Sequence, residues 1–388
     1  MPDAKPARPA ILQIVPSLDT GGAERTTIDI AKALVQSGFR ALVVSEGGRL
    51  ERELADAGGE LIRLKVASKM PYRLFRNARA LADIIVKENV LLVHARSRAP
   101  AWSGLVAAAS TKSAGVTTYH GIYNAKGQLK RWYNSVMARG DAVIANSEWT
   151  ARHILATYRF APKRLTIIPR GLDLHAFDPR AVGPERILAL RDSWRATQGM
   201  RVVLLPGRLT RWKGQLVFLS ALARLRAEGR LPHTLRAVIA GDPQGRDSYT
   251  RELTAMIARE GLGDVVTMAN HIADMPAAYL AADIVVSAST DPEAFGRVPP
   301  EAAAMGRPVI ATDHGGARET VLAGASGLLV TPNSDKAMAD ALADLLGRTP
   351  AELAAMGEKG RAHIAANFTV ERMCADTLGL YRTLMDER

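Results

Sequence analysis

Short apolar runs alternate with longer amphipathic stretches along this chain, and the alternation limits the folds that the chain can adopt. In the first half, six runs have the length and composition of buried strands: 10–16, 40–45, 90–95, 115–120, 141–147 and 164–169. The segments between most of them repeat apolar residues at helical spacing, as in 23–38, which closes on Gly38 as helices often do. Alternating strands and helices predict a parallel sheet with helices on both faces.

A second series of six apolar runs follows, at 201–206, 235–241, 264–269, 283–289, 307–313 and 327–331. Between the two series, residues 171–185 contain two prolines, two glycines and no strand pattern, so we place a hinge there. We therefore predict an α/β fold with two Rossmann-like domains, residues 1–175 and 176–368. Residues 369–388 have a helical pattern and could pack back on the N-terminal domain or cap the other one.

The composition is that of a globular protein long enough for two domains, with 388 residues, 47% hydrophobic and 23% charged. Cys374 is the only cysteine, so no disulfide can form within the chain and a reducing compartment is the simplest expectation. The N-terminal segment has about five apolar residues in a row, too few for a signal-peptide core. No segment approaches the roughly 20 apolar residues of a membrane-spanning helix. We therefore expect a soluble, cytoplasmic protein.

The net charge of +12 is concentrated in one part of the chain. Residues 61–140 contain fourteen Lys and Arg but only two acidic residues, Asp83 and Glu88, an excess equal to the whole net charge. Such a segment attracts nucleic acid, an anionic membrane face or a phosphorylated saccharide, although a solvated basic surface without a partner would have the same composition. Aromatic residues lie among these cations, namely Trp102, Tyr119, Tyr123, Trp132 and Tyr133. Because aromatic and basic side chains together suit an interface between apolar and charged groups, we favour a membrane surface or a lipid-borne acceptor.

Both series open in the same way, with a strand, a proline, a short polar turn and then glycine before a helix. In an open α/β sheet, ligands gather at the carboxyl ends of the strands, where such turns lie. In the first turn, Gly21 and Gly22 would let the backbone approach a phosphate at a helix N-terminus. A plain tight turn explains the two glycines equally well, and Glu24 could simply favour the helix dipole.

The second opening turn carries two cations. Arg208 and Lys213 flank a strand-to-helix turn in which Gly214 starts the helix. Arg through its fork and Lys as a point charge could clamp a diphosphate. Ordinary surface charge is the alternative, and the position at a strand end favours the ligand.

The stretch 291–301, DPEAFGRVPPE, is predicted to be a turn between a strand and a helix. Proline suits the first helical turn, so Glu301 falls in that turn, while Glu293 stands on the loop. Gly296 and its neighbours leave backbone amides free to meet an anion. A carboxylate near a helix N-terminus can hold a ribose diol, as in dinucleotide sites. Alternatively, Glu301 serves only the helix dipole and Glu293 is a solvated loop charge.

On these motifs the chain resembles the family 4 glycosyltransferases. The resemblance implies the GT-B fold, in which two Rossmann-like domains face each other across a cleft, and a retaining reaction that uses a nucleotide-sugar donor. It covers nearly the whole chain, on GGAE (21–24), TYHG (118–121), ANSEWT (145–150), IIPRGLD (167–173), PGRLTRWKG (206–214), EAFGRVPPE (293–301) and TDHGG (312–316). The Arg and Lys turn combined with the two glutamates is the most specific part.

The resemblance implies a role for each matched position. Arg208 and Lys213 would grip the donor diphosphate and neutralise the leaving group, and both would be catalytic. Glu293, also catalytic, would bind hydroxyls of the donor sugar, and Glu301 would hold the nucleotide ribose. Further donor contacts would come from Gly21, Gly22 and the amides of Phe295 and Gly296. His120 would be catalytic near the reacting sugar, although outside the family pattern it could be an ordinary strand-end histidine.

The resemblance also implies that the leaving phosphate takes the proton of the acceptor, so the enzyme needs cations and positioning more than a base. Glu293 and Glu301 would then not be the nucleophile and acid that retention usually requires. No Asp and His cluster has the spacing of metal ligands, so we expect no metal and no cofactor besides the substrate.

Four features depart from the family pattern. Arg170 stands where asparagine is frequent, Arg297 where an aliphatic residue is common, and Pro300 where leucine is frequent. Residues 271–275 lack the glycine often found near the base pocket. These departures leave the donor base and the shape of the acceptor site open.

We therefore expect a hexosyltransferase that acts on a lipid-linked or lipopolysaccharide acceptor, in lipopolysaccharide core or envelope glycan synthesis. The N-terminal domain would bind the acceptor and the C-terminal domain the nucleotide sugar. Residues 61–140 would hold the protein at the inner face of the cytoplasmic membrane, and no nucleic acid partner is expected. The alternatives are a soluble sugar synthase or nucleotide-sugar epimerase of the same fold, and a non-enzymatic basic protein that binds membranes or nucleic acid.

Overall fold

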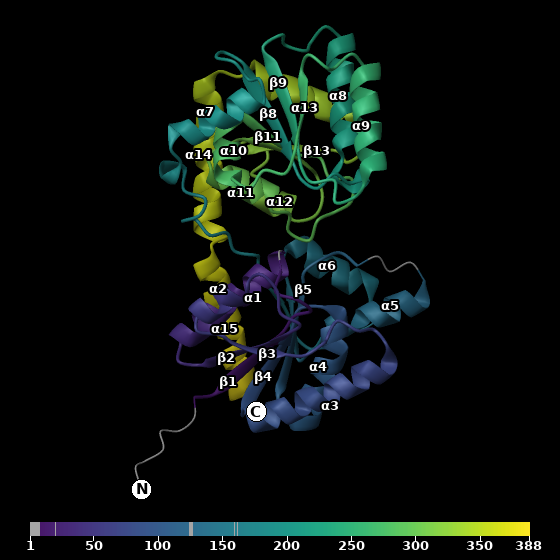
Figure 1. Ribbon diagram of the computed structural model, residues 1–388, viewed down its shortest axis with the longest axis vertical. Coiled ribbons are helices and arrows are strands. Elements are labelled where there is room, and N and C mark those ends of the chain that lie inside the picture. The colour runs from purple at the N-terminus through teal and green to yellow at the C-terminus, as the bar shows by residue number, and fades with distance from the viewer. Residues whose placement is uncertain (1–7, 20, 124–126, 159, 161) are drawn as a thin grey trace. The chain divides into compact units, whose positions relative to one another are not determined.

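The computed structural model describes residues 8–19, 21–123, 127–158, 160 and 162–388. The chain divides into two compact units, one formed by Met1–Gly171 with Val370–Arg388 and the other by Leu172–Thr369 (Figure 1). Each unit is built on a parallel β-sheet of its own. Within the described residues, no helix combines the length and the apolar composition needed to cross a bilayer.

The first unit contains a seven-stranded sheet in the order β3-β2-β1-β4-β5-β6-β7. Its strands are β1 (Ala10–Ile14), β2 (Arg40–Ser45), β3 (Glu60–Arg63), β4 (Val90–Ala95), β5 (Ala114–Tyr119), β6 (Ala142–Ala145) and β7 (Leu165–Ile167). Its helices are α1 (Gly22–Gln36), α2 (Glu51–Asp56), α3 (Pro71–Lys87), α4 (Arg98–Thr111), α5 (Gln128–Asn134), the 3-10 helix η1 (Ser135–Ala138), α6 (Glu148–Thr157) and α15 (Val370–Asp386). Helices α1, α2 and α15 cover one face of the sheet, and α3 and α4 cover the other (Figure 1).

The second unit contains a six-stranded sheet in the order β10-β9-β8-β11-β12-β13. Its strands are β8 (Arg201–Pro206), β9 (Leu235–Ala240), β10 (Val266–Ala269), β11 (Ile284–Ser287), β12 (Val309–Thr312) and β13 (Gly327–Val330). Its helices are η2 (Pro179–Ala181), α7 (Pro184–Ser193), η3 (Arg211–Lys213), α8 (Gln215–Ala227), α9 (Asp247–Arg259), α10 (Met275–Ala281), α11 (Val298–Ala304), α12 (Ala317–Thr320), α13 (Asp335–Gly347) and α14 (Pro350–Asn367). Helices α8, α9 and α13 cover one face, and α7, α10, α11 and α14 cover the other (Figure 1).

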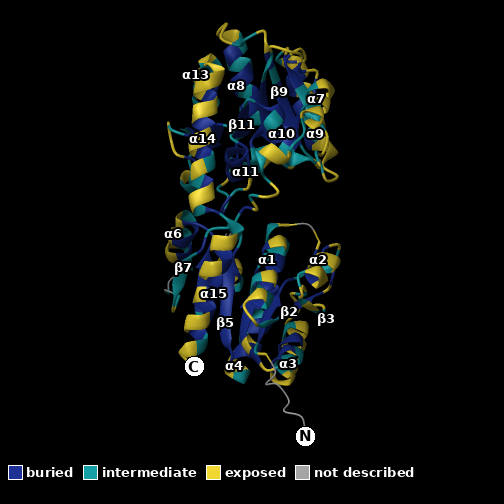
Figure 2. Ribbon diagram, turned by 90° about the vertical axis from the view of Figure 1, so that its left-hand side faces the viewer, coloured by how far each residue is buried: buried dark blue, intermediate teal, exposed yellow. Residues whose placement is uncertain are grey.

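Most strands are buried along most of their length, as the dark strands between lighter helices in Figure 2 show. A strand covered by helices on both faces has no polar side, which is why the sequence shows continuous apolar runs rather than alternation. In the second unit, for example, Leu205 and Phe218 belong to the core beneath α8, while Val202 and Tyr279 belong to the core beneath α10. Because helices cover both faces of each sheet, its loops are accessible only at the two ends of the strands.

Each of the twelve predicted runs contains or overlaps a strand, and the two parallel Rossmann-like sheets confirm the predicted fold class. The sequence reading missed β3, which pairs only with β2 at the edge of the first sheet. Its sequence, ELIR, has charged residues at both ends, and none of its four residues is fully buried. An edge strand of this kind lacks the apolar run that identified the others.

Candidate functional site

The strand order identifies one ligand-binding edge in each unit. The order reverses between β1 and β4 in the first sheet and between β8 and β11 in the second. In open α/β sheets, ligands bind outside the carboxyl ends of the strands at such switch points. The turn after β8 holds Arg208 and Lys213, and the loop after β11 holds Glu293. The second unit therefore gathers three predicted catalytic residues at its switch point.

Lys213 and Glu293 form an ion pair at this edge. The Lys213 ammonium donates a hydrogen bond to Glu293 Oε1 at 2.8 Å, and both side chains are largely buried. The Ser289 hydroxyl donates to the same oxygen at 2.6 Å. Both of these hydrogen bonds use Oε1, so Oε2 is left to accept a further donor. The carboxylate is therefore held in one orientation while it keeps capacity for a ligand hydroxyl.

The backbone around Gly214 brings these two side chains together. Gly214 has φ of +75°, and a Cβ there would lie 1.8 Å from the carbonyl oxygen of Ala288, just after β11. The amide of Thr290 also donates to the carbonyl of Trp212 at 2.7 Å. Only glycine permits so close an approach in this conformation, and the approach places the two loops against each other.

A second glycine pair supports the loop of Glu293. The amide of Gly316 donates to the carbonyl of Glu293 at 3.0 Å. A Cβ on Gly315 would lie 2.3 Å from that same carbonyl oxygen, and one on Gly316 would lie 2.4 Å from the carbonyl oxygen of Phe295. The sequence analysis used TDHGG only as a family motif and missed this supporting role. A glycine pair directly after a buried strand was the signal that could have indicated it.

Arg208 and Lys213 differ in their surroundings. Arg208 is exposed and lies 5.8 Å from the centre of the Trp212 ring, while the Lys213 ammonium lies 4.6 Å from it. Among the described residues, no carboxylate forms a salt bridge with Arg208, whereas Lys213 is paired with Glu293. Arg208 thus contributes an uncompensated positive charge beside a compensated one.

Glu301 has a separate set of partners. It is buried in the first turn of α11, where the Tyr279 hydroxyl donates to Oε2 at 2.8 Å and Arg297 Nε donates to Oε1 at 2.7 Å. Burial, reinforced by the charge of Glu301, raises the pKa of Tyr279 well above its usual value, so the hydroxyl stays a donor. Among the described residues, Glu293 and Glu301 therefore have separate hydrogen-bond partners.

Phe295 and Gly296 can offer only backbone to a ligand. The Phe295 side chain is buried in a cluster with Leu172 and Phe368. Gly296 has φ of +75°, a conformation that glycine adopts without strain. Their predicted contribution through amides is compatible with this geometry.

In the first unit, Gly22 begins α1 and Gly21 is its N-cap residue. A Cβ on Gly22 would lie 2.3 Å from Nη1 of Arg170, so the guanidinium occupies the space that a side chain would need. Arg170 is the residue that stands in place of the frequent asparagine. The structure therefore links this departure from the family pattern to the glycine turn.

His120 follows β5 and lies between two guanidinium groups. Arg170 Nη2 is 3.3 Å from His120 Nδ1, and Arg96 Nη1 is 3.5 Å from His120 Nε2. Burial, followed by the charges of Arg170 and Arg96, lowers the pKa of His120 well below its usual value. The imidazole is therefore neutral at physiological pH, with one ring nitrogen that donates a hydrogen bond and one that accepts.

Arg96 is a functional candidate that the sequence reading missed. It was counted as part of the basic segment, yet only 3% of it is exposed. Its Nε and Nη2 donate to Gln13 Oε1 at 3.1 and 2.7 Å, and no described carboxylate forms a salt bridge with it. Its place directly after the buried run of β4 was the available signal, because that is the ligand-binding edge of the sheet.

A buried polar network anchors α15 beside this cluster. His94, in the middle of the sheet, hydrogen-bonds Tyr381 of α15 through Nδ1 and Thr118 through Nε2, the latter at 2.7 Å. Burial, followed by the charge of Arg96, lowers the pKa of His94 well below its usual value. The C-terminal helix thus belongs to the first unit by packing and by a specific hydrogen bond.

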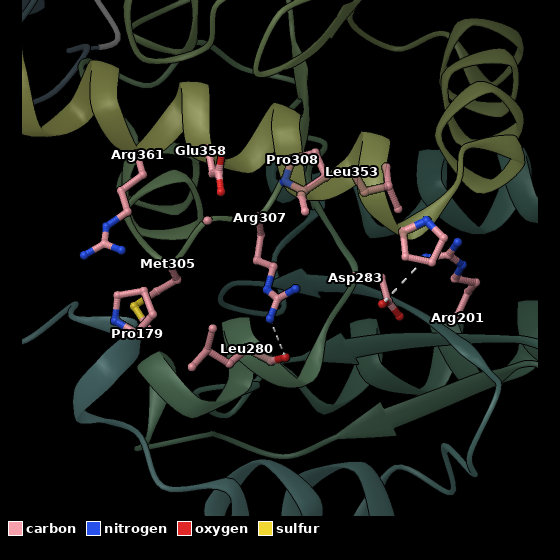
Figure 3. Close-up of a pocket in the computed structure, with 13 residues that line it drawn as sticks. Pro179, Arg201, Leu280, Asp283, Met305, Arg307, Pro308, Leu353, Glu358 and Arg361 are labelled. Carbon is pink, nitrogen blue, oxygen red and sulfur yellow. Dashed lines mark hydrogen bonds and ion pairs between the residues drawn. The ribbon is translucent and has the colours of Figure 1, made fainter.

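A cavity of about 360 Å³ lies at the opposite edge of the second sheet. Figure 3 shows Arg307 pointing into it, with Glu358 and Arg361 of α14 on one side and Leu280 on the other. Its wall includes Arg201, the first residue of β8, so it lies at the amino ends of the strands. None of the predicted site residues lines it. Among the described residues, no group of three His, Cys, Asp or Glu could hold a metal ion.

Comparison with known proteins identifies relatives of both units. Residues 188–363 match the family model described as Glycosyl transferases group 1, and residues 20–176 match that of Glycosyltransferase Family 4. A glycosyltransferase from Rickettsia africae has a similar structure, with a TM-score of 0.88 and 33% identity over 98% of this chain and 100% of that chain. Anabaena HepE, solved with UDP and glucose, has a TM-score of 0.81 and 26% identity over 97% of this chain and 100% of its own.

Curated relatives match over part of their length. The D-inositol 3-phosphate glycosyltransferase of Stackebrandtia nassauensis is 34% identical over 262 residues, which is 65% of this chain and 56% of that protein. The chain therefore spans about half the length of the curated relatives it matches.

Proposed function

This chain belongs to the family 4 glycosyltransferases of the GT-B fold, and we propose that it transfers a hexose from a nucleotide-diphosphate sugar to a membrane-associated saccharide or lipid acceptor, with retention. The observation that carries the proposal is the Lys213 and Glu293 pair at the switch point of the second sheet. It places a cation and an oriented carboxylate where an α/β sheet binds its ligand.

The pair suits the two ends of a sugar diphosphate. Lys213 has three N–H donors and uses one on Glu293, so others can reach a phosphate oxygen. Arg208 adds a second cation without a carboxylate partner among the described residues. Glu293 keeps Oε2 for a sugar hydroxyl. Together they would bind both the leaving group and the sugar that is transferred.

The proposed reaction needs no enzymatic base. The acceptor oxygen attacks the anomeric carbon on the face from which the phosphate leaves, the bond from that carbon to the phosphate oxygen breaks, and the phosphate oxygen takes the acceptor's proton. Arg208 and Lys213 would stabilise the charge that develops on the diphosphate. A neutral His120 would contribute hydrogen bonding near the reacting sugar rather than charge. No metal is required in this scheme.

A uridine nucleotide is the donor that we favour. The Anabaena relative was solved with UDP-glucose as well as with UDP and glucose. The glycine, cation and glutamate motifs concern the phosphates, the sugar and the ribose rather than the base. GDP- and ADP-sugars are therefore tested beside UDP-sugars.

A basic and apolar surface on the first unit supports a membrane-associated acceptor. Phe75 on α3 is 74% exposed and Leu129 on α5 is 79% exposed. Trp132 of α5 lies against Trp102 of α4, with the two rings tilted and their centres 4.7 Å apart, and α4 packs on α3. The same two helices carry exposed basic residues, namely Arg73, Arg76, Arg79, Lys130 and Arg131. Exposed aromatic and aliphatic side chains among cations suit the headgroup region of an anionic bilayer. We propose that this surface holds the enzyme at the inner face of the cytoplasmic membrane, where envelope glycans such as the lipopolysaccharide core are assembled.

A soluble phosphorylated acceptor is the second candidate. The curated relatives are named for D-inositol 3-phosphate, and Arg96 and Arg170 of the first unit converge on His120. Such an acceptor would not require the exposed apolar residues of α3 and α5. Vesicle binding therefore separates the two acceptor classes.

A thermal-shift and hydrolysis screen with UDP-, GDP- and ADP-hexoses tests the donor. One of them should raise the melting temperature, because a ligand at 100 times its Kd stabilises the folded state by about 2.7 kcal/mol. The same nucleotide sugar should be hydrolysed slowly, with release of its nucleoside diphosphate. Lys213→Met should lose the shift. Lys336→Met removes an exposed lysine of α13 that is paired with Asp340, and this variant should keep the shift. No response to any nucleotide sugar would contradict the proposal.

Co-sedimentation with anionic vesicles tests the membrane surface. Wild type should bind vesicles that contain anionic lipid, and Phe75→Ser with Trp132→Ser should release it. Leu188→Ser removes an apolar side chain that is 59% exposed on α7 and serves as the control. Equal binding by all three proteins would show that α3 and α5 are not the membrane-binding surface, and no binding by wild type would favour the soluble acceptor.

A further inference from the structure

Glu301 and Arg297 form a pair that the assignment of donor-binding residues does not explain. Glu301 is 6% exposed, and its two oxygens accept from Arg297 Nε and the Tyr279 hydroxyl. Arg297 stands where the family commonly has an aliphatic residue. Its side chain is 50% exposed, so one edge faces the carboxylate and the rest faces solvent.

The burial of Glu301 explains why a cation is needed. An ionised carboxylate taken out of water is costly unless it is paired and hydrogen-bonded. Tyr279 is fully buried and supplies a neutral hydrogen bond, so it cannot offset the charge. Among the described residues, Arg297 is the cation that forms a salt bridge with Glu301.

The start of α11 fixes the geometry of the pair. Arg297 is the N-cap residue, and Glu301, four positions later, donates its amide to the Arg297 carbonyl at 3.1 Å. Pro299 and Pro300 lie between them in the first turn, where the fixed φ of proline stiffens the helix start. The two prolines thus hold the backbone that aligns the guanidinium with the carboxylate. The stiffening of the helix start explains why proline stands at position 300, where leucine is frequent in the family.

The pair leaves Glu301 able to bind a ligand. Each carboxylate oxygen has two acceptor positions and uses one on a protein donor. The remaining positions can accept hydroxyls, and the two protein donors prevent the carboxylate from rotating.

We propose that Arg297 is a positioning residue for the donor nucleotide: it compensates and orients Glu301, so that Glu301 accepts the hydroxyls of the ribose. This inference rests on the proposed function, because it assumes a nucleotide donor at this edge of the second unit. Arg297 acts through Glu301 and does not take part in the transfer step. Its removal should therefore weaken nucleotide binding and leave turnover at saturating donor nearly unchanged.

The experiment measures the Kd of UDP and of 2′-deoxy-UDP by calorimetry for wild type, Arg297→Leu and Arg297→Lys. Wild type should bind UDP more tightly than the deoxy analogue. Arg297→Leu should lose about tenfold in UDP affinity, with little further loss for the analogue, so the preference for the ribose hydroxyl shrinks. Arg297→Lys keeps the charge without the fork and should recover part of that preference.

Matched controls separate this role from a general structural one. Arg348→Leu breaks another pair with four-residue spacing, in which Arg348 Nε donates to Asp344 at 3.0 Å, and should bind both nucleotides like wild type. If Arg297→Leu binds UDP as wild type does, or keeps the full preference over 2′-deoxy-UDP, the role of Arg297 is wrong. If wild type binds no nucleotide or nucleotide sugar, the proposed function itself fails. If Arg297→Leu does not fold, Arg297→Lys decides the question by the ratio of its Kd for 2′-deoxy-UDP to its Kd for UDP.

Discussion

The opening turns of the two sheets have the same local plan but are closed by different neighbours. Gly22 faces the guanidinium of Arg170, a side-chain end that can move, whereas Gly214 faces the backbone carbonyl of Ala288, which cannot. The first turn is therefore defined by a cation and the second by the packing of two loops. The same sequence signal, a glycine between a strand and a helix, thus carries different physical demands.

The ligand-binding edges of the two sheets also differ in how their positive charges are compensated. In the first unit, Arg96 and Arg170 approach a neutral His120. In the second unit, Lys213 is already paired with Glu293. Arg96 is buried and forms no salt bridge with a described carboxylate, and a cation of this kind favours an anionic ligand. An ion pair such as that of Lys213 instead holds a side chain in position until a ligand arrives. Three experiments test this contrast.

The largest effect is expected for Glu293→Gln. The amide keeps the shape of the side chain but removes the charge that orients Lys213 and weakens the acceptor for a sugar hydroxyl. Turnover should fall on the order of 100- to 1,000-fold, as when one oriented polar group is lost from an active site. Initial rates at saturating nucleotide sugar measure it. Glu252→Gln, which neutralises a carboxylate paired with Arg211, should retain activity, and full activity in Glu293→Gln would overturn the assigned role.

The next effect concerns stability and separates the two glycines. Gly214→Ala should lower the free energy of unfolding by about 2 to 4 kcal/mol, because it combines an unfavourable φ with a collision against backbone. Gly22→Ala should cost less than about 1 kcal/mol, since Arg170 can move aside. Gly229→Ala is the control, with φ of +66° and no atom within 4 Å of the added Cβ. Urea unfolding measures all three, and equal costs for Gly214 and Gly229 would show that the close approach to Ala288 does not matter.

Much of the fold followed from the sequence because buried parallel strands leave continuous apolar runs. The runs at 40–45, 90–95 and 201–206 coincide with β2, β4 and β8 to the residue. The edge strand β3 could not be found in this way, since its pairing with β2 depends on tertiary structure and not on its own composition.

The site was predicted less completely than the fold. Arg208 and Lys213 could be named because a strand end with two cations is a local pattern. The burial of Arg96 could not, because its sequence neighbours do not reveal that Gln13, on the adjacent strand, takes its hydrogen bonds. The pairing of Arg297 with Glu301 could have been predicted from their four-residue spacing. The burial of Glu301 and its hydrogen bond from Tyr279 could not, because both depend on tertiary structure.

The smallest effect is a pH dependence that should arise in the first unit. Burial lowers the pKa of His94 in the folded protein, so the unfolded chain, with a histidine pKa near 6.5, binds the proton more readily. Stability from this group is therefore complete above about pH 7 and is lost as the pH falls below 6.5, by roughly 1.4 kcal/mol at pH 5.5. Three groups surround the ring, namely Arg96, His120 and Tyr381. Each carries positive charge or stays neutral, so none of them offsets the added proton.

Urea unfolding at pH 7.5 and 5.5 measures this dependence. Between the two pH values, His94→Gln should lose less free energy of unfolding than wild type. His233→Gln, which changes an exposed residue of the second unit, should lose as much as wild type. An unchanged loss in His94→Gln would place the acid sensitivity elsewhere and remove one basis for contrasting the two edges.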